Sequence, residues 1–320
     1  MLHLLTLADW TAPQVEAALK LAQAIKTDPA AYATTLQRRT LLMIFEKPSL
    51  RTRLSFETGM TQMGGHAIYY DTRTSPLGSG KESLADTAQT FSRYVDIAMA
   101  RLFKHSDLEE LAGYATIPVI NALTEKAHPC QILADLLTIK EKKGTLKGLK
   151  LAYLGDSNNN VTHSLLVGCA LTGMHIAVGC PDAAAYAPQP EVVERAQHIA
   201  GSTGATIEIT AAAKRAATEA DIVYTDSWMS YHVPSSELDE RVARLMPYQV
   251  NEELMQCAKP AAIFMNCLPA LRGYEQTAAV IDGPQSVVFD QAENRLHAQK
   301  AVLVTLLQQA DRHAGATPHG

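Results

Sequence analysis

The sequence is poor in the features that mark membrane, nucleic-acid-binding and disulfide-rich proteins. Its five cysteines are an odd number without a C-x-x-C spacing, which fits reduced thiols and offers no zinc-finger pattern. No apolar run approaches the roughly 20 residues that span a bilayer, and the N-terminus lacks a secretory signal pattern. Basic residues form no block and the formal net charge is −5, so we expect no nucleic-acid partner. These absences together predict a cytoplasmic protein without a bound metal.

The remaining composition is that of an ordinary globular protein. Apolar residues make up 47% of the chain and charged residues 19%, and 320 residues are enough for two domains with separate cores. Short apolar runs alternate with helical patterns, which predicts an α/β fold in which parallel sheets are flanked by helices. The expected strands are 40–45, 66–70, 96–100 and 118–121, followed by 149–154, 175–178, 206–209, 222–225, 261–265 and 286–289.

The chain is expected to divide near residues 140–148, a charged segment that contains glycine. The predicted domains are 1–143 and 144–290, and the C-terminal segment 291–320 is predicted to form a long amphipathic helix. Residues 1–38 are predicted to be helical. Because ligands gather at the carboxyl ends of parallel strands, we expect the site residues to lie at such ends.

The stretch Phe45–Glu57 is the most informative part of the sequence. It follows an apolar run and leads into a helical pattern, so Ser49 is placed to cap a helix whose first N–H groups attract an anion. Arg51 and Arg53 would add guanidinium groups that suit phosphate oxygens. A capped helix with two solvated arginines is the alternative.

This stretch resembles the carbamoyl-phosphate loop of the aspartate/ornithine carbamoyltransferase family, usually written S-T-R-T-R. Leu50 replaces the middle threonine. Further motifs of that family recur in the same order along nearly the whole chain. They are His128-Pro129-Cys130-Gln131, Asp156 to Ser164, Asp226-Ser227-Trp228-Met229-Ser230, Cys267-Leu268-Pro269 and Glu293 to His297.

The resemblance implies that the C-terminal helix, 291–320, packs back on the first domain and that the active site lies in the cleft between the domains. It also implies a function for each matched position. Arg101, His128, Asp226 and Cys267 are expected to be catalytic. Carbamoyl phosphate is expected to contact Ser49, Leu50, Arg51, Thr52, Arg101, His128, Gln131, Cys267, Leu268 and Arg295. The amine acceptor is expected to contact Asn160, Asp226, Ser230 and Tyr231. Taken alone, an Asp at a strand end is also an ordinary turn residue, and Cys267 an ordinary buried residue.

The acceptor motifs depart from the ornithine-type pattern at three positions. Tyr231 and His232 stand where that pattern has Met and Gly, and Asn266 stands where it has His. A family loop inserted by a neighbouring subunit corresponds to residues 75–83, where this chain has Lys81 and lacks the usual glutamine. These departures leave the identity of the acceptor open.

The resemblance implies an enzyme of arginine metabolism and amino-acid biosynthesis that transfers the carbamoyl group of carbamoyl phosphate to the side-chain amine of ornithine, giving citrulline and phosphate. It needs no cofactor, because carbamoyl phosphate is already activated. The expected assembly is a homotrimer with shared active sites and no membrane partner. Two alternatives remain: an enzyme for another amine, such as a diamine or modified ornithine, and a non-catalytic, anion-binding regulator.

Overall fold

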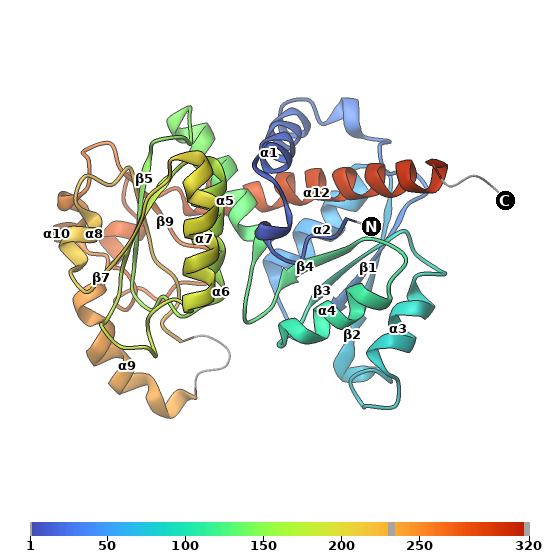
Figure 1. The fold of residues 1–320 in the computed structure, drawn as a ribbon, viewed down its shortest axis with the longest axis horizontal. Coiled ribbons are helices and arrows are strands. Elements are labelled where there is room, and N and C mark those ends of the chain that lie inside the picture. Colours follow the sequence, from blue (N-terminus) through green and yellow to red (C-terminus); the bar gives the residue numbers. More distant parts are fainter. Residues whose placement is uncertain (1, 230–233, 317–320) are drawn as a thin grey trace. The chain divides into compact units, whose positions relative to one another are not determined.

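The structure is a computed structural model that describes residues 2–229 and 234–316. The chain forms two compact units (Figure 1). Unit 1 contains the residues up to Leu137 together with those from Asn294 onward, and unit 2 contains Thr138–Glu293. The C-terminal helix α12, Val288–Ala316, therefore returns the chain to unit 1.

Unit 1 is built on a parallel sheet of four strands in the order β2-β1-β3-β4. The strands are β1 (Thr40–Phe45), β2 (His66–Asp71), β3 (Ile97–Arg101) and β4 (Val119–Leu123). Phe45 at the end of β1 is in register with Arg101 at the end of β3. The turn that follows β1 and the Arg101 side chain therefore start from the same edge of the sheet.

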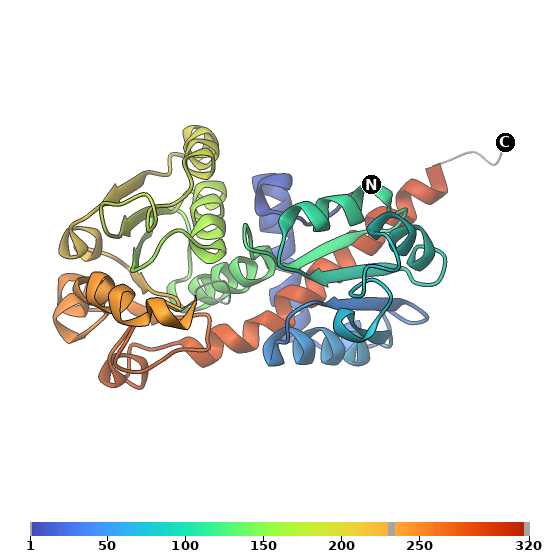
Figure 2. The ribbon, with the colours of Figure 1, turned by 90° about the horizontal axis from the view of Figure 1, so that it is seen from below.

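Helices cover both faces of this sheet. One face packs on α3 (Leu84–Phe91) and α4 (His105–Tyr114) through an apolar cluster that includes Leu42, Ala98 and Leu111. Figure 2 shows α2 (Leu50–Gln62) on the opposite side of the strands from α4. The other helical segments are α1 (Ala12–Thr27), α5 (Pro129–Lys143) and the 3-10 turns η1 (Leu7–Asp9), η2 (Ala30–Tyr32) and η3 (Thr72–Thr74).

Unit 2 contains a parallel sheet of five strands in the order β7-β6-β5-β8-β9. These are β5 (Lys150–Leu154), β6 (His175–Gly179), β7 (Ile207–Thr210), β8 (Ile222–Tyr224) and β9 (Ile263–Met265). The strand order reverses direction beside β5. Ligands of open α/β sheets bind at such a switch point, so the ends of β5 and β8 are the expected place for a small molecule.

The helices of unit 2 lie on two sides of its sheet (Figure 1). α6 (Asn160–Thr172) and α7 (Pro190–Thr203) lie side by side. The other face packs on α8 (Ala213–Ala217), α10 (Glu252–Cys257) and α11 (Ala278–Ile281) through a second apolar cluster. The remaining elements are α9 (Leu238–Leu245), η4 (Ser235–Glu237) and η5 (Met246–Tyr248).

The predicted fold class is confirmed: each unit is a parallel sheet flanked by helices. Two expected elements were wrong. Residues 286–289 form no strand, because Ser286 makes only an isolated bridge to Phe264 and α12 already starts at Val288. Residues 1–38 are not one helix. Leu4 instead lies along β4 with backbone hydrogen bonds to Val119 and Asn121, and α1 ends before Pro29.

Candidate active site

The turn between β1 and α2 is organised by Ser49. Its hydroxyl accepts a hydrogen bond from the Thr52 N–H at 3.3 Å and lies 3.1 Å from the Thr52 hydroxyl, so Ser49 caps the helix. The N–H groups of Leu50 and Arg51 open the first turn, where no intrahelical acceptor exists. The Leu50 side chain is 71% exposed, so only its backbone belongs to this turn. The geometry is that of an anion site at a helix N-terminus.

Buried polar side chains gather beside this turn. Arg295 is 2% exposed and donates to the Gln131 amide oxygen at 2.7 Å and to the Thr52 hydroxyl at 3.5 Å. Gln131 in turn donates to Asp135 at 2.9 Å. With its amide oriented to satisfy its neighbours, Gln299 also accepts from Arg295 at 2.8 Å. Three residues that the sequence predicted for one ligand, Thr52, Gln131 and Arg295, are therefore in contact.

His128 lies within the same cationic group and is 4% exposed. Burial holds its pKa well below the ordinary value, and four neighbouring cations act in the same direction. In order of decreasing effect they are Arg295, Arg101, Lys47 and Arg51. His128 is therefore a neutral imidazole near neutral pH, which can donate a hydrogen bond without carrying a charge.

The loop that carries His128 is fixed by the buried side chain of Asn121 on β4. Its amide donates to the carbonyl of Ala127 at 3.2 Å and to the carbonyl of Leu5 at 2.8 Å. The Cys130 thiol donates to the Asn121 carbonyl at 3.4 Å, and burial raises the pKa of this thiol to about 12. Cys130, in the first turn of α5, therefore packs against β4 as part of the fold.

Lys47 belongs to this site, although the sequence analysis gave it no function. It is 7% exposed, and its ammonium lies 4.6 Å from the centre of the Phe103 ring. Burial lowers its pKa to about 8, with a smaller contribution from the positive charge of Arg101. The only indication in the sequence was its position before Pro48, in the turn between β1 and α2. That position does not show that the side chain is buried.

Arg53 differs from the expectation that it would supply charge to the phosphate turn. Its side chain is 48% exposed, pairs with Glu57 one helical turn later at 3.2 Å, and stacks 4.1 Å from the Tyr69 ring. Residues i and i+4 share a helix face, so this pair holds the guanidinium along the surface of α2. Arg51 and Arg53 therefore have different environments.

In unit 2, three adjacent asparagines follow β5, and the last two, Asn159 and Asn160, have different environments. Asn159 is buried and caps α6, since its amide oxygen accepts from the N–H groups of Val161 and Thr162 at 2.9 Å. Its amide nitrogen donates to the Asp156 carbonyl at 2.6 Å. Asn160 is the first residue of the helix and is half-buried. Asn159 is thus committed to the fold, whereas Asn160 stands at the helix N-terminus.

Asp226 and Cys267 meet at the ends of neighbouring strands. Asp226 follows β8 and Cys267 follows β9, and the Cys267 thiol donates to the Asp226 carboxylate at 3.0 Å. Both side chains are half-buried. Burial raises the pKa of the Tyr153 phenol well above its ordinary value, and the negative charge of Asp226 adds to that shift. Two predicted catalytic residues of unit 2 are therefore paired.

Leu268 has an unusual backbone beside this pair. Its φ is +57°, in the left-handed region that residues with a side chain rarely adopt. The Leu268 N–H donates to the side-chain oxygen of Asn266 at 2.8 Å, which stabilises the turn. Asn266, where the family pattern has His, is fully buried and also donates to Gln276 at 3.1 Å.

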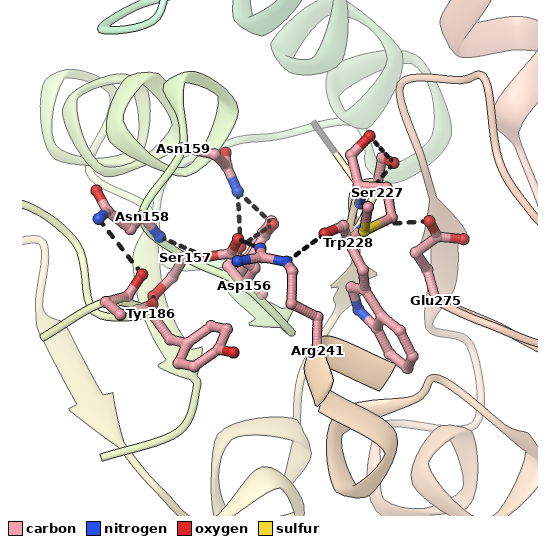
Figure 3. Close-up of polar contacts among 12 residues, drawn as sticks. Asp156, Ser157, Asn158, Asn159, Tyr186, Ser227, Trp228, Arg241 and Glu275 are labelled. Carbon is pink, nitrogen blue, oxygen red and sulfur yellow. Dashed lines mark hydrogen bonds and ion pairs between the residues drawn. The ribbon is translucent and has the colours of Figure 1, made fainter. Parts of the chain in front are cut away.

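Charged side chains also hold the peptide groups of Trp228, as Figure 3 shows. The Trp228 N–H donates to Glu275 at 3.1 Å, and its carbonyl accepts from Arg241 at 2.9 Å. Arg241 forms a buried ion pair with Asp156. Burial raises the pKa of Glu275, whereas hydrogen bonds from backbone N–H groups oppose this shift. The sequence analysis missed Arg241 and Glu275, since neither lies in a recognisable motif.

Gly155, which precedes Asp156, needs to be glycine. Its φ is +129°, and a Cβ there would lie 3.0 Å from the indole nitrogen of Trp228. Only glycine allows the turn after β5 to approach the buried tryptophan this closely.

The predicted acceptor residues Ser230 and Tyr231, and the departure at His232, lie outside the described residues. Within residues 2–229 and 234–316, no cluster of three His, Cys, Asp or Glu side chains has the arrangement of a metal site. In the same ranges, every helix is too short or too polar to cross a bilayer.

Two family models match the chain. Residues 2–141 match the carbamoyl-phosphate-binding domain of aspartate/ornithine carbamoyltransferase, and residues 147–306 match its Asp/Orn-binding domain. The chain belongs to the aspartate/ornithine carbamoyltransferase family.

Individual members of the carbamoyltransferase family are similar over nearly their full length. The chain is 52% identical over 305 residues to an ornithine carbamoyltransferase of Anoxybacillus flavithermus, covering 95% of this chain and 96% of that protein. The structure of ornithine carbamoyltransferase from Pyrococcus furiosus matches with a TM-score of 0.91 at 47% identity, covering 96% and 97% of the two chains. An anabolic ornithine carbamoyltransferase from Campylobacter jejuni matches with a TM-score of 0.90 at 36% identity, covering 97% and 100%.

Proposed function

We propose that this chain transfers the carbamoyl group of carbamoyl phosphate to the side-chain amine of L-ornithine, giving citrulline and phosphate. One observation carries the proposal: Thr52, Gln131 and Arg295 are hydrogen-bonded beside a capped helix N-terminus, in a chain of this family. The names of the relatives at about half identity support ornithine as the acceptor.

Carbamoyl phosphate would bind to unit 1. The first turn of α2 and the Arg51 guanidinium suit the phosphate oxygens, because both provide N–H donors and positive charge. The carbonyl oxygen would accept from Thr52, Arg101 and neutral His128. The full set proposed for this substrate is Ser49, Leu50, Arg51, Thr52, Arg101, His128, Gln131 and Arg295 in unit 1, with Cys267 and Leu268 in unit 2.

Ornithine would bind to unit 2, through Asn160, Asp226, Ser230 and Tyr231. An alkyl amine with a pKa near 10.4 is neutral in only about one molecule in a few thousand at pH 7, so the enzyme must bind the neutral, nucleophilic form. The Asp226 carboxylate, which accepts a hydrogen bond from the Cys267 thiol, would also accept one from the amine. This contact would orient the nitrogen lone pair toward the carbonyl carbon.

Transfer requires that the amine held by unit 2 attack the carbamoyl carbon held by unit 1. A C–N bond forms, negative charge develops on the carbonyl oxygen, and donors aimed at that oxygen lower the barrier. The C–O bond to phosphate then breaks, and the nitrogen releases one proton. Holding two substrates in register supplies much of the acceleration.

The test is the colorimetric detection of the ureido product from carbamoyl phosphate and a panel of amines. We expect citrulline from ornithine at a higher rate than products from a diamine or an Nα-modified ornithine. Tyr231 and His232 depart from the ornithine pattern and favour a second candidate, an enzyme for such an alternative amine. A faster rate with one of them would establish that candidate. No product from any amine, together with tight phosphate binding, would contradict both.

The assembly and the setting are also part of the proposal. By resemblance to the family we propose a cytoplasmic homotrimer with shared active sites, acting in arginine biosynthesis, with domains at 1–143, 144–290 and 291–320. Sedimentation should give a particle three times the 34.7 kDa chain mass. A monomer at micromolar concentration would contradict the trimer.

A further inference from the structure

The segments that carry Asp226 and Cys267 leave the sheet just before these residues. The parallel pairing of β8 and β9 ends with Tyr224 opposite Met265, and the last backbone hydrogen bond runs from Thr225 to Met265 at 3.3 Å. Backbone hydrogen bonds between the two strands therefore do not extend to the 3.0 Å contact between Cys267 and Asp226. Side chains must fix the contact.

Glu275 fixes the first of the two segments. It is 1% exposed, and its two carboxylate oxygens accept from different backbone N–H groups, those of Trp228 and Leu271, each at 3.1 Å. Trp228 lies two residues after Asp226. Figure 3 shows Glu275 beside Trp228, with Arg241 binding the Trp228 carbonyl from another side.

Gln276 fixes the second segment. It is fully buried, its amide oxygen accepts from Asn266 at 3.1 Å, and its amide nitrogen donates to the Leu271 carbonyl at 3.1 Å. Asn266 immediately precedes Cys267 and holds the Leu268 N–H at 2.8 Å. The side chain of Gln276 thus reaches the peptide that carries the thiol.

The backbone of this dipeptide is itself anchored. The Glu275 carbonyl accepts from the Val250 N–H at 2.9 Å, and the Thr277 N–H donates to the Val250 carbonyl at 3.0 Å. Adjacent residues on one fixed peptide therefore bind the Asp226 segment and the Cys267 segment separately.

We propose that Glu275 and Gln276 are positioning residues that set the distance between Asp226 and Cys267, and through it the affinity for the amine substrate. The link to the amine rests on the proposed function. Neither residue touches the reacting atoms in this assignment. Each acts through Asp226 or Cys267.

The test uses Glu275→Gln in the full chain with Cys257→Ser, since Cys257 is the other half-exposed thiol. Glutamine has the same shape but only one acceptor oxygen, so one of the two backbone N–H groups faces an NH2 donor. We expect the ornithine KM to rise about tenfold, equivalent to about 1.4 kcal/mol, while the KM for carbamoyl phosphate, most of whose proposed contacts lie in unit 1, should rise less. Alkylation of Cys267 by iodoacetamide should be several-fold faster.

Glu252→Gln is the matched control. Glu252 is exposed and accepts from the Thr277 hydroxyl at 2.9 Å. The control substitution therefore removes a carboxylate next to the dipeptide without affecting a contact to either segment. Its ornithine KM and Cys267 alkylation rate should equal those of the parent. If Glu275→Gln does not fold, Gln276→Leu, which leaves Asn266 without its acceptor, is measured in the same two assays.

The alkylation rate is measured without substrate, so it tests the positioning function separately from the proposed carbamoyl transfer. Faster alkylation in the Glu275 variant would support the positioning function even if the parent made no citrulline, an outcome that would overturn only the proposed reaction. A folded variant with parental ornithine KM and parental alkylation would overturn the positioning function. A fall in turnover with unchanged ornithine KM and alkylation would do the same, because it would make Glu275 an acid or base instead.

Discussion

The two units build their parts of the site by different means. In unit 1 four cations surround a neutral histidine near a helix N-terminus. In unit 2 the central pair is a carboxylate and a thiol, and a buried ion pair of Arg241 and Asp156 is also present in this unit. A phosphate-sized anion suits the first environment, whereas an amine, which donates hydrogen bonds, suits the second.

The units also differ in how their residues are held. The turn between β1 and α2 in unit 1 is one short segment, fixed by the Ser49 cap and by the register of β1 with β3. The acceptor side depends on side chains from distant turns, such as Glu275 and Arg241, which bind the backbone of Trp228. A substitution in the turn of unit 1 should therefore alter anion binding directly. A substitution at Glu275 or Arg241 should act by changing the positions of other residues in unit 2.

The largest expected effect is on turnover, from Asp226→Asn. The amide keeps the shape of the side chain but loses the charge that orients the amine, and such groups contribute about 10²- to 10⁴-fold. We expect kcat for citrulline formation to fall by about 1,000-fold, while phosphate affinity measured by calorimetry is unchanged.

Asp182→Asn is the control for Asp226. Asp182 lies shortly after β6 in the same sheet and is exposed, so its loss of charge should leave kcat within twofold. An equal loss of turnover and of phosphate binding in Asp226→Asn would mean that Asp226 holds the fold, and the contrast between the units would disappear.

The next effect concerns the anion and separates two arginines of one motif. Arg51→Met should weaken carbamoyl-phosphate binding by roughly 10- to 150-fold, because a charged hydrogen bond contributes about 1.5–3 kcal/mol. Arg53→Met should change affinity less than twofold, since Arg53 pairs with Glu57 on the helix surface. Calorimetry with inorganic phosphate and the KM for carbamoyl phosphate measure both variants. Equal losses would show that both arginines reach the ligand.

Much of the fold and part of the site could be predicted from the sequence. Apolar runs bounded by turn residues gave nearly every strand, because buried parallel strands need such runs. The false strand at 286–289 is also apolar in part, but Val288 and Phe289 open α12 instead. Periodicity does not distinguish a short buried strand from the start of a helix.

The site residues that the sequence missed share one property. Lys47, Arg241 and Glu275 matter because they are buried beside a functional group, and burial of a charged residue depends on the whole fold. Lys and Glu are exposed in most proteins, so composition and spacing predict an exposed side chain at these positions. Arg53 shows the reverse error. Its place in the motif suggested a contact with the ligand, but its side chain pairs with Glu57, four residues later on the same helix.

The smallest expected effect is a pH dependence that arises in unit 1 alone. Burial lowers the pKa of Lys47 to about 8, so the side chain is charged at pH 7 and mostly neutral at pH 9. A positive charge favours a phosphate dianion, and the affinity of the parent for carbamoyl phosphate should therefore fall as the pH rises through about 8. Lys47→Met should bind several-fold more weakly at pH 7 and lose this dependence.

The decisive quantity is the ratio of the carbamoyl-phosphate KM in Lys47→Met to that in the parent, measured from pH 6.5 to 9. Taking the ratio cancels the titration of the substrate, which is the same for both proteins. It should be largest near pH 7 and approach one at pH 9. Lys104→Met, at an exposed lysine shortly after β3, should give a ratio of one throughout. A constant ratio for Lys47→Met would mean that the Lys47 ammonium of the parent stays charged over this range. Unit 1 would then keep all of its positive charge at pH 9.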